Sequence, residues 1–138
     1  MKHEDVLVET DQLLTEINNP NIRIFDATIL FYIGLSPEEA AKMPTAHEQY
    51  LAGHIPSSSC LPLTDLMIEW DAFLPNDQLA LRLNSTGQHK RIITYCGGGI
   101  AATVNAMAYL MAGNQNVAMY DGSLFEWTGE RLPVTSNE

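Results

Sequence analysis

The sequence predicts an α/β fold in which a central parallel sheet is flanked by helices on both faces. Short apolar runs with β-branched residues alternate along the chain with segments of helical periodicity. The segment 91–95 is the strongest predicted strand, and three glycines separate its end from an apolar helical segment at 100–112. Strands that alternate with helices form parallel sheets with right-handed crossovers, and such sheets hold their sites beyond the carboxyl ends of the strands.

The composition limits the kinds of partner. We interpret the 138 residues as one domain over residues 1–138. The 17 acidic and 7 basic residues give a net charge of −10, which disfavours binding to nucleic acid and to anionic membranes. The sequence has no apolar run of the roughly 20 residues that a membrane helix needs, and its start does not resemble a secretory signal, so we expect a cytoplasmic protein. The two cysteines, Cys60 and Cys96, lack zinc-ligand spacing, so we expect no metal and no cofactor.

The first segment predicts a strand, a helix and a second strand. Residues 6–8 form a short apolar run, and Thr10 can cap a helix that stops before Pro20. The apolar residues of that helix face one side: Leu13, Leu14 and Ile17. The segment 22–26 then reads as a buried strand that ends in an acid, Asp26.

The middle segment predicts an excursion followed by shorter elements. Within residues 28–44, the stretch Ser36-Pro37-Glu38-Glu39 is typical of a helix start, and we expect this excursion to cover part of one face of the sheet. A helical turn at 47–51 precedes the break at Gly53-His54-Ile55-Pro56. A short strand near Cys60, a helix at 63–70 and a helix at 78–84 that ends before Gly87 complete this part.

The last segment predicts the central strand and helix, followed by one more strand and one more helix. Residues 91–95 form the strand that ends at Cys96, and the helix at 100–112 is apolar on nearly every side, which is typical of a helix packed on a sheet. Residues 117–120 form the next strand. Asp121-Gly122-Ser123 then serve as loop and cap for a short helix through Trp127.

Cys96 is the main candidate for chemistry. It lies between a strand and a helix start, where unpaired N–H groups and the helix dipole stabilise anions. The glycines that follow it can turn their N–H groups inward around an anionic sulfur. The alternative interpretation is a buried, inert cysteine beside a glycine-rich turn.

Four motifs in order resemble the rhodanese-like sulfurtransferase domain, over about residues 5–134. They are Asp26-Ala27, which closes the second strand; Leu51-Ala52-Gly53-His54-Ile55-Pro56; Tyr95-Cys96-Gly97-Gly98-Gly99-Ile100-Ala101-Ala102; and Tyr120-Asp121-Gly122-Ser123-Leu124-Phe125-Glu126-Trp127 with Leu132-Pro133-Val134. The resemblance implies a rhodanese-like fold and a reaction in which Cys96 takes sulfane sulfur from a small donor, holds it as a persulfide and passes it on. Thiosulfate and 3-mercaptopyruvate are the donor classes that it implies.

The resemblance also implies the other parts of the site. The backbone N–H groups of the segment after the cysteine would cradle the transferred sulfur: Gly97, Gly98, Gly99, Ile100, Ala101 and Ala102. A thiol, cyanide or a sulfur-accepting protein would take it. Asp26, His54 and Asp121 are candidates for lining the site, although His54 reads more simply as a structural imidazole and the two acids as loop caps. For Cys60 we favour a buried, inert thiol over one that resolves an oxidised Cys96.

The chain departs from the family pattern in ways that bear on its function. The loop is nearest the mercaptopyruvate type, but Gly98 and Ala101 replace its hydroxyl residues, so the loop carries no polar side chain. The arginine that often follows the strand-end acid is absent after Asp26. A phosphatase of related fold would need an arginine where Ala102 stands, which disfavours that activity. Two classes remain: an active sulfurtransferase, and a binding, sulfur-carrier or redox-sensing module with little turnover of its own.

Overall fold

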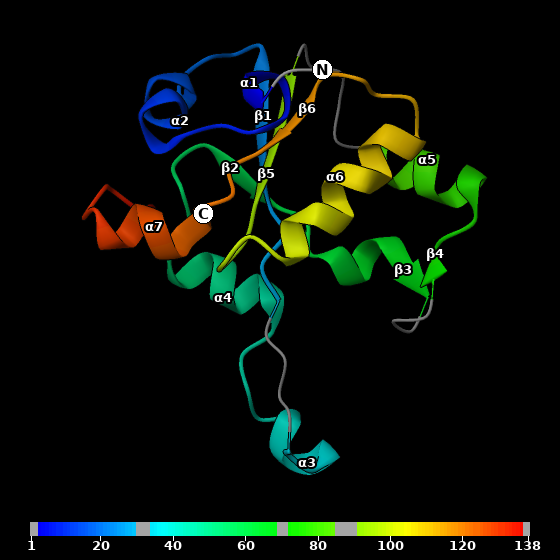
Figure 1. The fold of residues 1–138 in the computed structure, drawn as a ribbon. Coiled ribbons are helices and arrows are strands. Elements are labelled where there is room, and N and C mark those ends of the chain that lie inside the picture. Colours follow the sequence, from blue (N-terminus) through cyan, green and yellow to red (C-terminus); the bar gives the residue numbers. More distant parts are fainter. Residues whose placement is uncertain (1–2, 30–33, 69–71, 85–90, 137–138) are drawn as a thin grey trace.

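The computed structural model describes residues 3–29, 34–68, 72–84 and 91–136, and Figure 1 shows the arrangement of its elements. Strands and helices alternate along most of the chain. In chain order the elements are α1 (His3–Val6), α2 (Thr10–Glu16), β1 (Ile22–Asp26), α3 (Pro37–Ala40), α4 (Ala46–Ala52), β2 (Ser58–Cys60), the 3₁₀ turn η1 (Leu63–Leu66), β3 (Met67–Ile68), β4 (Ala72–Phe73), α5 (Asn76–Asn84), β5 (Arg91–Tyr95), α6 (Ala101–Met111), β6 (Val117–Met119) and α7 (Ser123–Gly129).

Four parallel strands form the central sheet, in the order β2-β1-β5-β6. The register places Asp26 of β1 opposite Cys60 of β2 on one side and opposite Tyr95 of β5 on the other. Both central strands end in consecutive buried residues, as expected for parallel strands that are covered on two faces. The predicted parallel α/β sheet is therefore confirmed.

Side chains of the central strands alternate between two hydrophobic clusters, one on each face of the sheet. Ile24 and Ile93 belong to the cluster that contains Leu13 of α2 and Trp127 of α7. Their neighbours Phe25 and Ile92 belong to the opposite cluster, with residues of α5 and α6: Leu79, Leu83, Ala108 and Tyr109. In Figure 1, α2 and α7 accordingly lie on one side of the sheet, and α5 and α6 on the other. The expected helical cover on both faces is confirmed.

The prediction for residues 6–8 was wrong. Val6 ends helix α1, and Leu7 contributes only an isolated parallel bridge to Met119 of β6. The N–H of Val8 donates to the Met119 carbonyl at 2.8 Å. Because α1 ends at Val6 and Glu9 caps α2, the extended stretch between the two helices is too short for a fifth strand.

Helix α2 forms as predicted, but its cap differs. Glu9 occupies the N-cap position, and its N–H donates to the Gln12 side chain at 3.0 Å. Thr10 is instead buried, and its hydroxyl lies 2.9 Å from the hydroxyl of Tyr120. Leu14, which we expected on the buried face, is 40% exposed. A helix of only seven residues buries little beyond the face of Leu13.

The predicted helix over residues 63–70 is limited to the 3₁₀ turn η1. The chain then enters β3, which pairs with β4 in an antiparallel hairpin, with Met67 opposite Phe73. The N–H of Leu74 donates to the Leu66 carbonyl at 2.9 Å, so this pairing takes up a carbonyl that a longer helix would need. Residues 69–71 and the predicted helix stop at Gly87 lie outside the described residues.

Helix α6 packs on the sheet through one face rather than on all sides. Its buried residues are Ala101, Ala102, Asn105, Ala108 and Tyr109. Met107 and Met111, which an apolar central helix would bury, are about half exposed, at 51% and 50%. In the part of the chain that the structure describes, no helix is long and apolar enough to cross a membrane.

Two short helices begin with the same capping arrangement but differ in burial. Ser36 caps α3 and Thr45 caps α4, and each side chain accepts the N–H of a glutamate three residues later at 3.1 Å. Helix α4 buries Tyr50, whereas α3 buries no residue and stands away from the body of the protein (Figure 1). The predicted helix start at Ser36 is confirmed, but α3 does not cover a face of the sheet.

This pair of helices generates a test of where capping affects global stability. We expect Thr45→Ala to lower the free energy of unfolding by about 1 kcal/mol, the usual effect of removing an N-cap. Ser36→Ala is the matched control and should lower it much less, because α3 can fray without exposing the core. Urea denaturation followed by circular dichroism measures both. Equal losses would contradict this account.

Candidate active site

The fold places Cys96 at a point where ligands commonly bind in α/β sheets. Cys96 directly follows β5, and α6 begins at Ala101. From β1 the chain first continues to β2 on one side and then returns to β5 on the other side of β1. The boundary between β1 and β5 is therefore the topological switch point of the sheet, where ligands commonly bind. The Cys96 side chain is 3% exposed. The cysteine is therefore a nearly buried group at the carboxyl edge of the sheet.

A backbone N–H from the loop points at the sulfur. The N–H of Gly99 donates to Cys96 Sγ, with 3.0 Å between nitrogen and sulfur. This contact stabilises negative charge on the sulfur without any side chain. One N–H of the glycine-rich loop is thus directed at the thiol.

The start of α7 holds this loop in place. The N–H of Cys96 donates to the Ser123 hydroxyl oxygen at 3.0 Å, and that hydroxyl donates to the Tyr120 carbonyl at 2.9 Å. The carbonyl of Cys96 accepts from the N–H of Leu124 at 2.9 Å, and the carbonyl of Gly97 accepts from that of Phe125 at 3.0 Å. Four hydrogen bonds therefore tie the loop and the end of β6 to the first turn of α7.

Gly99 is the loop residue whose lack of a side chain is required. Its φ of +96° lies in the left-handed region, which L side chains rarely adopt. An added Cβ would also lie 2.5 Å from the carbonyl oxygen of Asp121 and 2.9 Å from a carboxylate oxygen of the same residue. At Gly97 and Gly98 an added Cβ meets no described atom within 4 Å. The turn that aims the Gly99 N–H at the sulfur thus depends on glycine at this one position.

A small apolar pocket opens above the sulfur. Its volume is about 160 Å³, and it is lined by Ile29, Cys96, Gly97, Gly98, Ile100 and Ala101. Among these described residues none carries a charged side chain. Ile100 is 80% exposed, and Phe125, which is tied to Gly97, is 83% exposed. The pocket therefore has room for a small group, and two apolar side chains stand exposed next to the loop.

The residues predicted to form the cradle differ in their positions relative to the cysteine. Gly97, Gly98, Ile100 and Ala101 line the pocket, and Gly99 donates to the sulfur. Ala102 is fully buried, and its carbonyl accepts the Thr94 hydroxyl at 3.1 Å, so it anchors α6 on β5 instead of lining the pocket. The five predicted residues closest to the cysteine therefore lie at the pocket or at the sulfur, and their role as an N–H cradle stays a prediction.

Of the three further candidates, only Asp121 is next to the loop, where its backbone packs against Gly99 and its side chain is exposed. Asp26 is 2% exposed, and one of its carboxylate oxygens accepts the N–H of Thr28 at 2.8 Å. Burial raises the pKa of the Asp26 carboxyl above its usual value, against the opposing effect of that hydrogen bond. Asp26 does not line the Cys96 pocket. Its negative charge instead helps to raise the pKa of the Cys60 thiol.

His54 occupies a structural position. Its side chain is 1% exposed, its Nδ1 lies 2.8 Å from the Tyr50 carbonyl oxygen, and its ring stacks on that of Tyr50 at 3.8 Å between centroids. Its backbone pairs with Thr135 in an isolated bridge that fastens the C-terminal segment. These contacts correspond to the structural imidazole that we favoured from the sequence.

Cys60 cannot form a disulfide with Cys96 in this arrangement. Cys60 is opposite Asp26, which is opposite Tyr95, the residue before Cys96. Two strand spacings separate the cysteine backbones, about 10 Å, whereas a disulfide requires Cα atoms within about 7 Å. The possibility that Cys60 resolves an oxidised Cys96 is therefore not supported.

Ser123 is the supporting residue that the sequence did not single out for this role. Its side chain is fully buried and its φ is +57°, an unusual value for a residue other than glycine. The sequence identified it as a helix cap, but its hydrogen bond to Cys96 joins residues 27 positions apart. A contact of that separation exists only once β5 and β6 pair.

Comparison with known proteins relates this arrangement to sulfurtransferases. The chain is 30% identical over 132 residues to thiosulfate/3-mercaptopyruvate sulfurtransferase 1 of Arabidopsis thaliana, and 28% identical over 137 residues to a probable 3-mercaptopyruvate sulfurtransferase of Pseudomonas aeruginosa. The matches cover 93% and 96% of this chain but 33% and 45% of those proteins. The chain therefore spans less than half the length of these relatives.

The fold is similar to that of two solved structures. The Tum1 protein of Saccharomyces cerevisiae superposes with a TM-score of 0.73 at 24% identity, over 98% of this chain and 48% of that one. The 3-mercaptopyruvate sulfurtransferase SseA of Escherichia coli does so with a TM-score of 0.69 at 23% identity, over 95% of this chain and 51% of that one. The model of the rhodanese-like domain matches residues 9–130, most of the chain, and the chain therefore belongs to the rhodanese-like domain family.

Proposed function

We propose that this protein is a sulfurtransferase that carries sulfane sulfur as a persulfide on Cys96. The observation that carries this proposal is the hydrogen bond of 3.0 Å from the Gly99 N–H to Cys96 Sγ, in a small pocket at the end of β5. An N–H donated to Sγ stabilises the Cys96 thiolate, which is the attacking group when the persulfide forms and the leaving group when the sulfur is passed on. The names of the curated relatives support the same reaction class.

The reaction divides into two displacements at sulfur. In the first, the Cys96 thiolate attacks the outer sulfur of the donor, and the bond between that sulfur and the rest of the donor breaks. With thiosulfate, sulfite leaves with the bonding electron pair. In the second, an acceptor thiolate or cyanide attacks the outer sulfur of the persulfide, and Cys96 leaves as a thiolate. The electrons balance within each step, so no external oxidant or reductant is needed.

The chemistry of the pocket limits how the anion is stabilised. The segment from Cys96 to Ala102 has no Lys, Arg or polar side chain other than the cysteine, so stabilisation comes from backbone N–H groups. The net charge of −10 gives an anionic donor no long-range attraction. We therefore favour a donor of low charge. The 3-mercaptopyruvate and thiosulfate classes named by the relatives remain to be distinguished by experiment.

A second function is favoured by the surface next to the pocket. Ile100, which lines the pocket, and Phe125, whose N–H donates to the Gly97 carbonyl, are 80% and 83% exposed, and exposed apolar side chains next to a pocket can form part of a protein contact. This observation supports a carrier or sensing module that passes sulfur to a partner protein with little turnover on small molecules. The cytoplasmic location stays a prediction from the sequence.

The first test identifies the carrier of the sulfur. We expect intact-mass spectrometry after exposure to thiosulfate or 3-mercaptopyruvate to detect one added sulfur in the parent and in Cys60→Ser, but none in Cys96→Ser. Burial and the negative charges of Asp26 and Asp65 raise the pKa of Cys60 to about 11, so its thiol stays protonated at neutral pH. Loading that survives in Cys96→Ser and disappears in Cys60→Ser would overturn the assignment.

The second test concerns the turn at Gly99. Gly99→Ala places a Cβ against Asp121 in a left-handed conformation, so we expect a loss of about 2 to 4 kcal/mol in unfolding free energy. Displacing the N–H from the sulfur should also slow persulfide formation by roughly 100-fold, the usual effect of losing one such donor. Gly98→Ala is the matched control, because its Cβ meets open space, and it should change stability by less than about 0.5 kcal/mol. The proposal is wrong if both variants load sulfur at the parent rate.

The third test concerns the donor. We expect thiosulfate, a dianion, to have a lower kcat/KM than a neutral persulfide donor. Its kcat/KM should rise with moderate salt, which shortens the screening length to about 8 Å at physiological strength. At Gly97 an added Cβ meets no described atom within 4 Å, so we expect Gly97→Arg to be tolerated at the rim of the pocket and to improve thiosulfate use selectively. The measurement is kcat/KM for both donors across a salt series. A parent that strongly prefers thiosulfate, or an arginine variant without selective gain, would exclude local charge as the determinant.

A further inference from the structure

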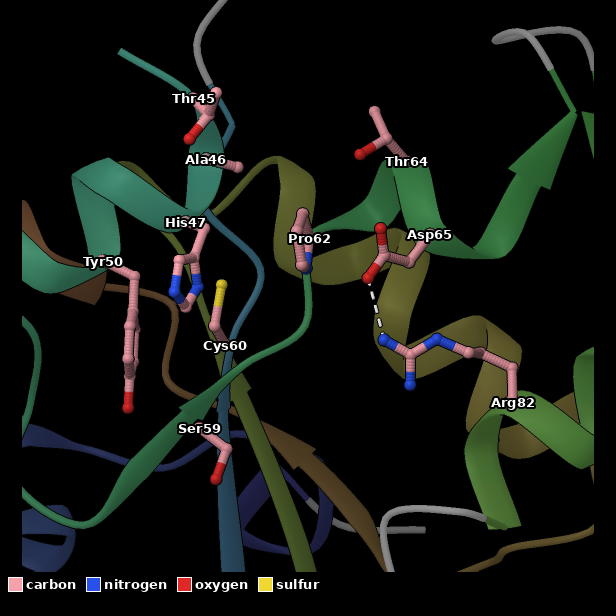
Figure 2. Close-up of a pocket in the computed structure, with 10 residues that line it drawn as sticks. All are labelled: Thr45, Ala46, His47, Tyr50, Ser59, Cys60, Pro62, Thr64, Asp65 and Arg82. Atoms are coloured by element: carbon pink, nitrogen blue, oxygen red, sulfur yellow. Dashed lines mark hydrogen bonds and ion pairs between the residues drawn. The ribbon is translucent and has the colours of Figure 1, made fainter. Parts of the chain in front are cut away.

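A second and larger cleft lies at the same edge of the sheet, beside Cys60. Its volume is about 620 Å³, within the range of small-molecule sites. Four elements converge on it in Figure 2: α4 with its cap on one side, η1 and α5 on the other, and the end of β2 between them. Among the described residues, none lines both this cleft and the Cys96 pocket. The cleft is therefore separate from the proposed sulfur-transfer site.

One side of the cleft presents a positive and a negative charge side by side. Arg82 of α5 donates from Nη2 to an oxygen of Asp65 at 2.8 Å. The two side chains are 37% and 41% exposed, so solutes can reach both (Figure 2). A half-exposed ion pair contributes little to stability. It does provide a matched pair of charges at fixed positions within the cleft.

The opposite side presents one aromatic ring, that of His47 on α4. It stacks against the buried ring of Tyr50 on the same helix, with 6.2 Å between centroids and 22° between the ring planes. In Figure 2 the His47 ring lies across the cleft from the ion pair. A small organic group can therefore pack on one wall while its polar groups face the other.

The Cys60 thiol forms part of the floor between the two walls (Figure 2). Burial is the main cause that raises its pKa to about 11, and the charges of Asp26 and Asp65 add to the effect. The thiol is consequently neutral at physiological pH and a poor nucleophile. The floor is thus a neutral surface that suits non-covalent binding.

These features define the charge of a suitable ligand. An anion would match Arg82 but meet Asp65, the charge of Asp26 near the floor and a protein of net charge −10. A cation would match Asp65 but meet Arg82. In the described part of the chain, no three His, Cys, Asp or Glu side chains come together as metal ligands. A molecule that carries one positive and one negative charge can interact with both Asp65 and Arg82. Because its net charge is zero, the negative field of the protein does not repel it.

We propose that this cleft binds a small zwitterion with an ammonium and a carboxylate group, such as an α-amino acid. The carboxylate is bound by Arg82, the ammonium by Asp65, and the side chain of the ligand packs toward His47. Binding is reversible and involves no bond to Cys60. The proposal does not depend on the sulfurtransferase reaction.

The test compares three probes of similar size by NMR titration of the full chain labelled with ¹⁵N. Alanine carries both charges, propionate only the negative one, and ethylammonium only the positive one. We expect alanine to shift the backbone amide signals of Cys60, Leu61 and residues 63–65 in a saturable way at millimolar concentration, corresponding to about 4 kcal/mol. Propionate and ethylammonium should each bind at least about tenfold more weakly, a difference of about 1.4 kcal/mol.

Variants locate the binding. Arg82→Gln and Asp65→Asn should each weaken alanine binding by about tenfold or more, a difference of about 1.4 kcal/mol. Cys96→Ser and Arg91→Gln should bind as the parent does, because neither residue lines the cleft. If Arg82→Gln fails to fold, Asp65→Asn carries the test. Three results would overturn the proposal: no saturable shift with alanine, equal binding of propionate, or parent-like binding by the folded cleft variants.

Discussion

The hydrogen bonds between the Cys96 loop and the start of α7 are the interactions on which the site depends. A loop with three glycines has many accessible conformations, and fixing it has a large entropic cost. Ser123, Leu124 and Phe125 hold the backbone at Cys96 and Gly97. That restraint keeps Gly99 in its left-handed turn against Asp121 and its N–H on the sulfur. The C-terminal helix thus preorganises a site that lies 27 residues earlier in the chain.

The character of the site follows from what stabilises charge there. Backbone N–H groups and an apolar rim leave the pocket with no fixed positive side chain among the described residues that line it. Such a site stabilises a small, polarisable anion such as a persulfide, but it offers little specific recognition to a charged donor. Specificity must then come from pocket size and from surfaces next to it, and the exposed Ile100 and Phe125 are the nearest such surface.

Strand register explains why two different sites lie at one edge of the sheet. β1 separates the end of β2, with Cys60, from the end of β5, with Cys96. Asp26 is the last residue of β1, the strand between them, and its negative charge helps to raise the pKa of the Cys60 thiol. The two thiols therefore have different environments: Cys96 accepts an N–H bond in an apolar pocket, whereas Cys60 lies in a polar cleft near negative charge. The chemistry and the binding that we propose are therefore located on the two sides of one strand.

The sequence by itself determined the order of the main strands and helices and the position of Cys96, because hydrophobic periodicity, caps and glycines are local signals. Ile22–Asp26 and Arg91–Tyr95 formed as predicted for that reason. Tertiary structure decided which strands pair and which distant residues come into contact, because local signals in the sequence carry no information on either. Residues 63–68 form a 3₁₀ turn and the first strand of a hairpin because β3 pairs with β4, and residues 6–8 form only an isolated bridge because they lie between the end of α1 and the start of α2. Likewise Ser123 reached Cys96, Asp26 faced Cys60, and Arg82 met Asp65 only because strand pairing brought distant segments together, and such contacts are fixed by register rather than by sequence spacing.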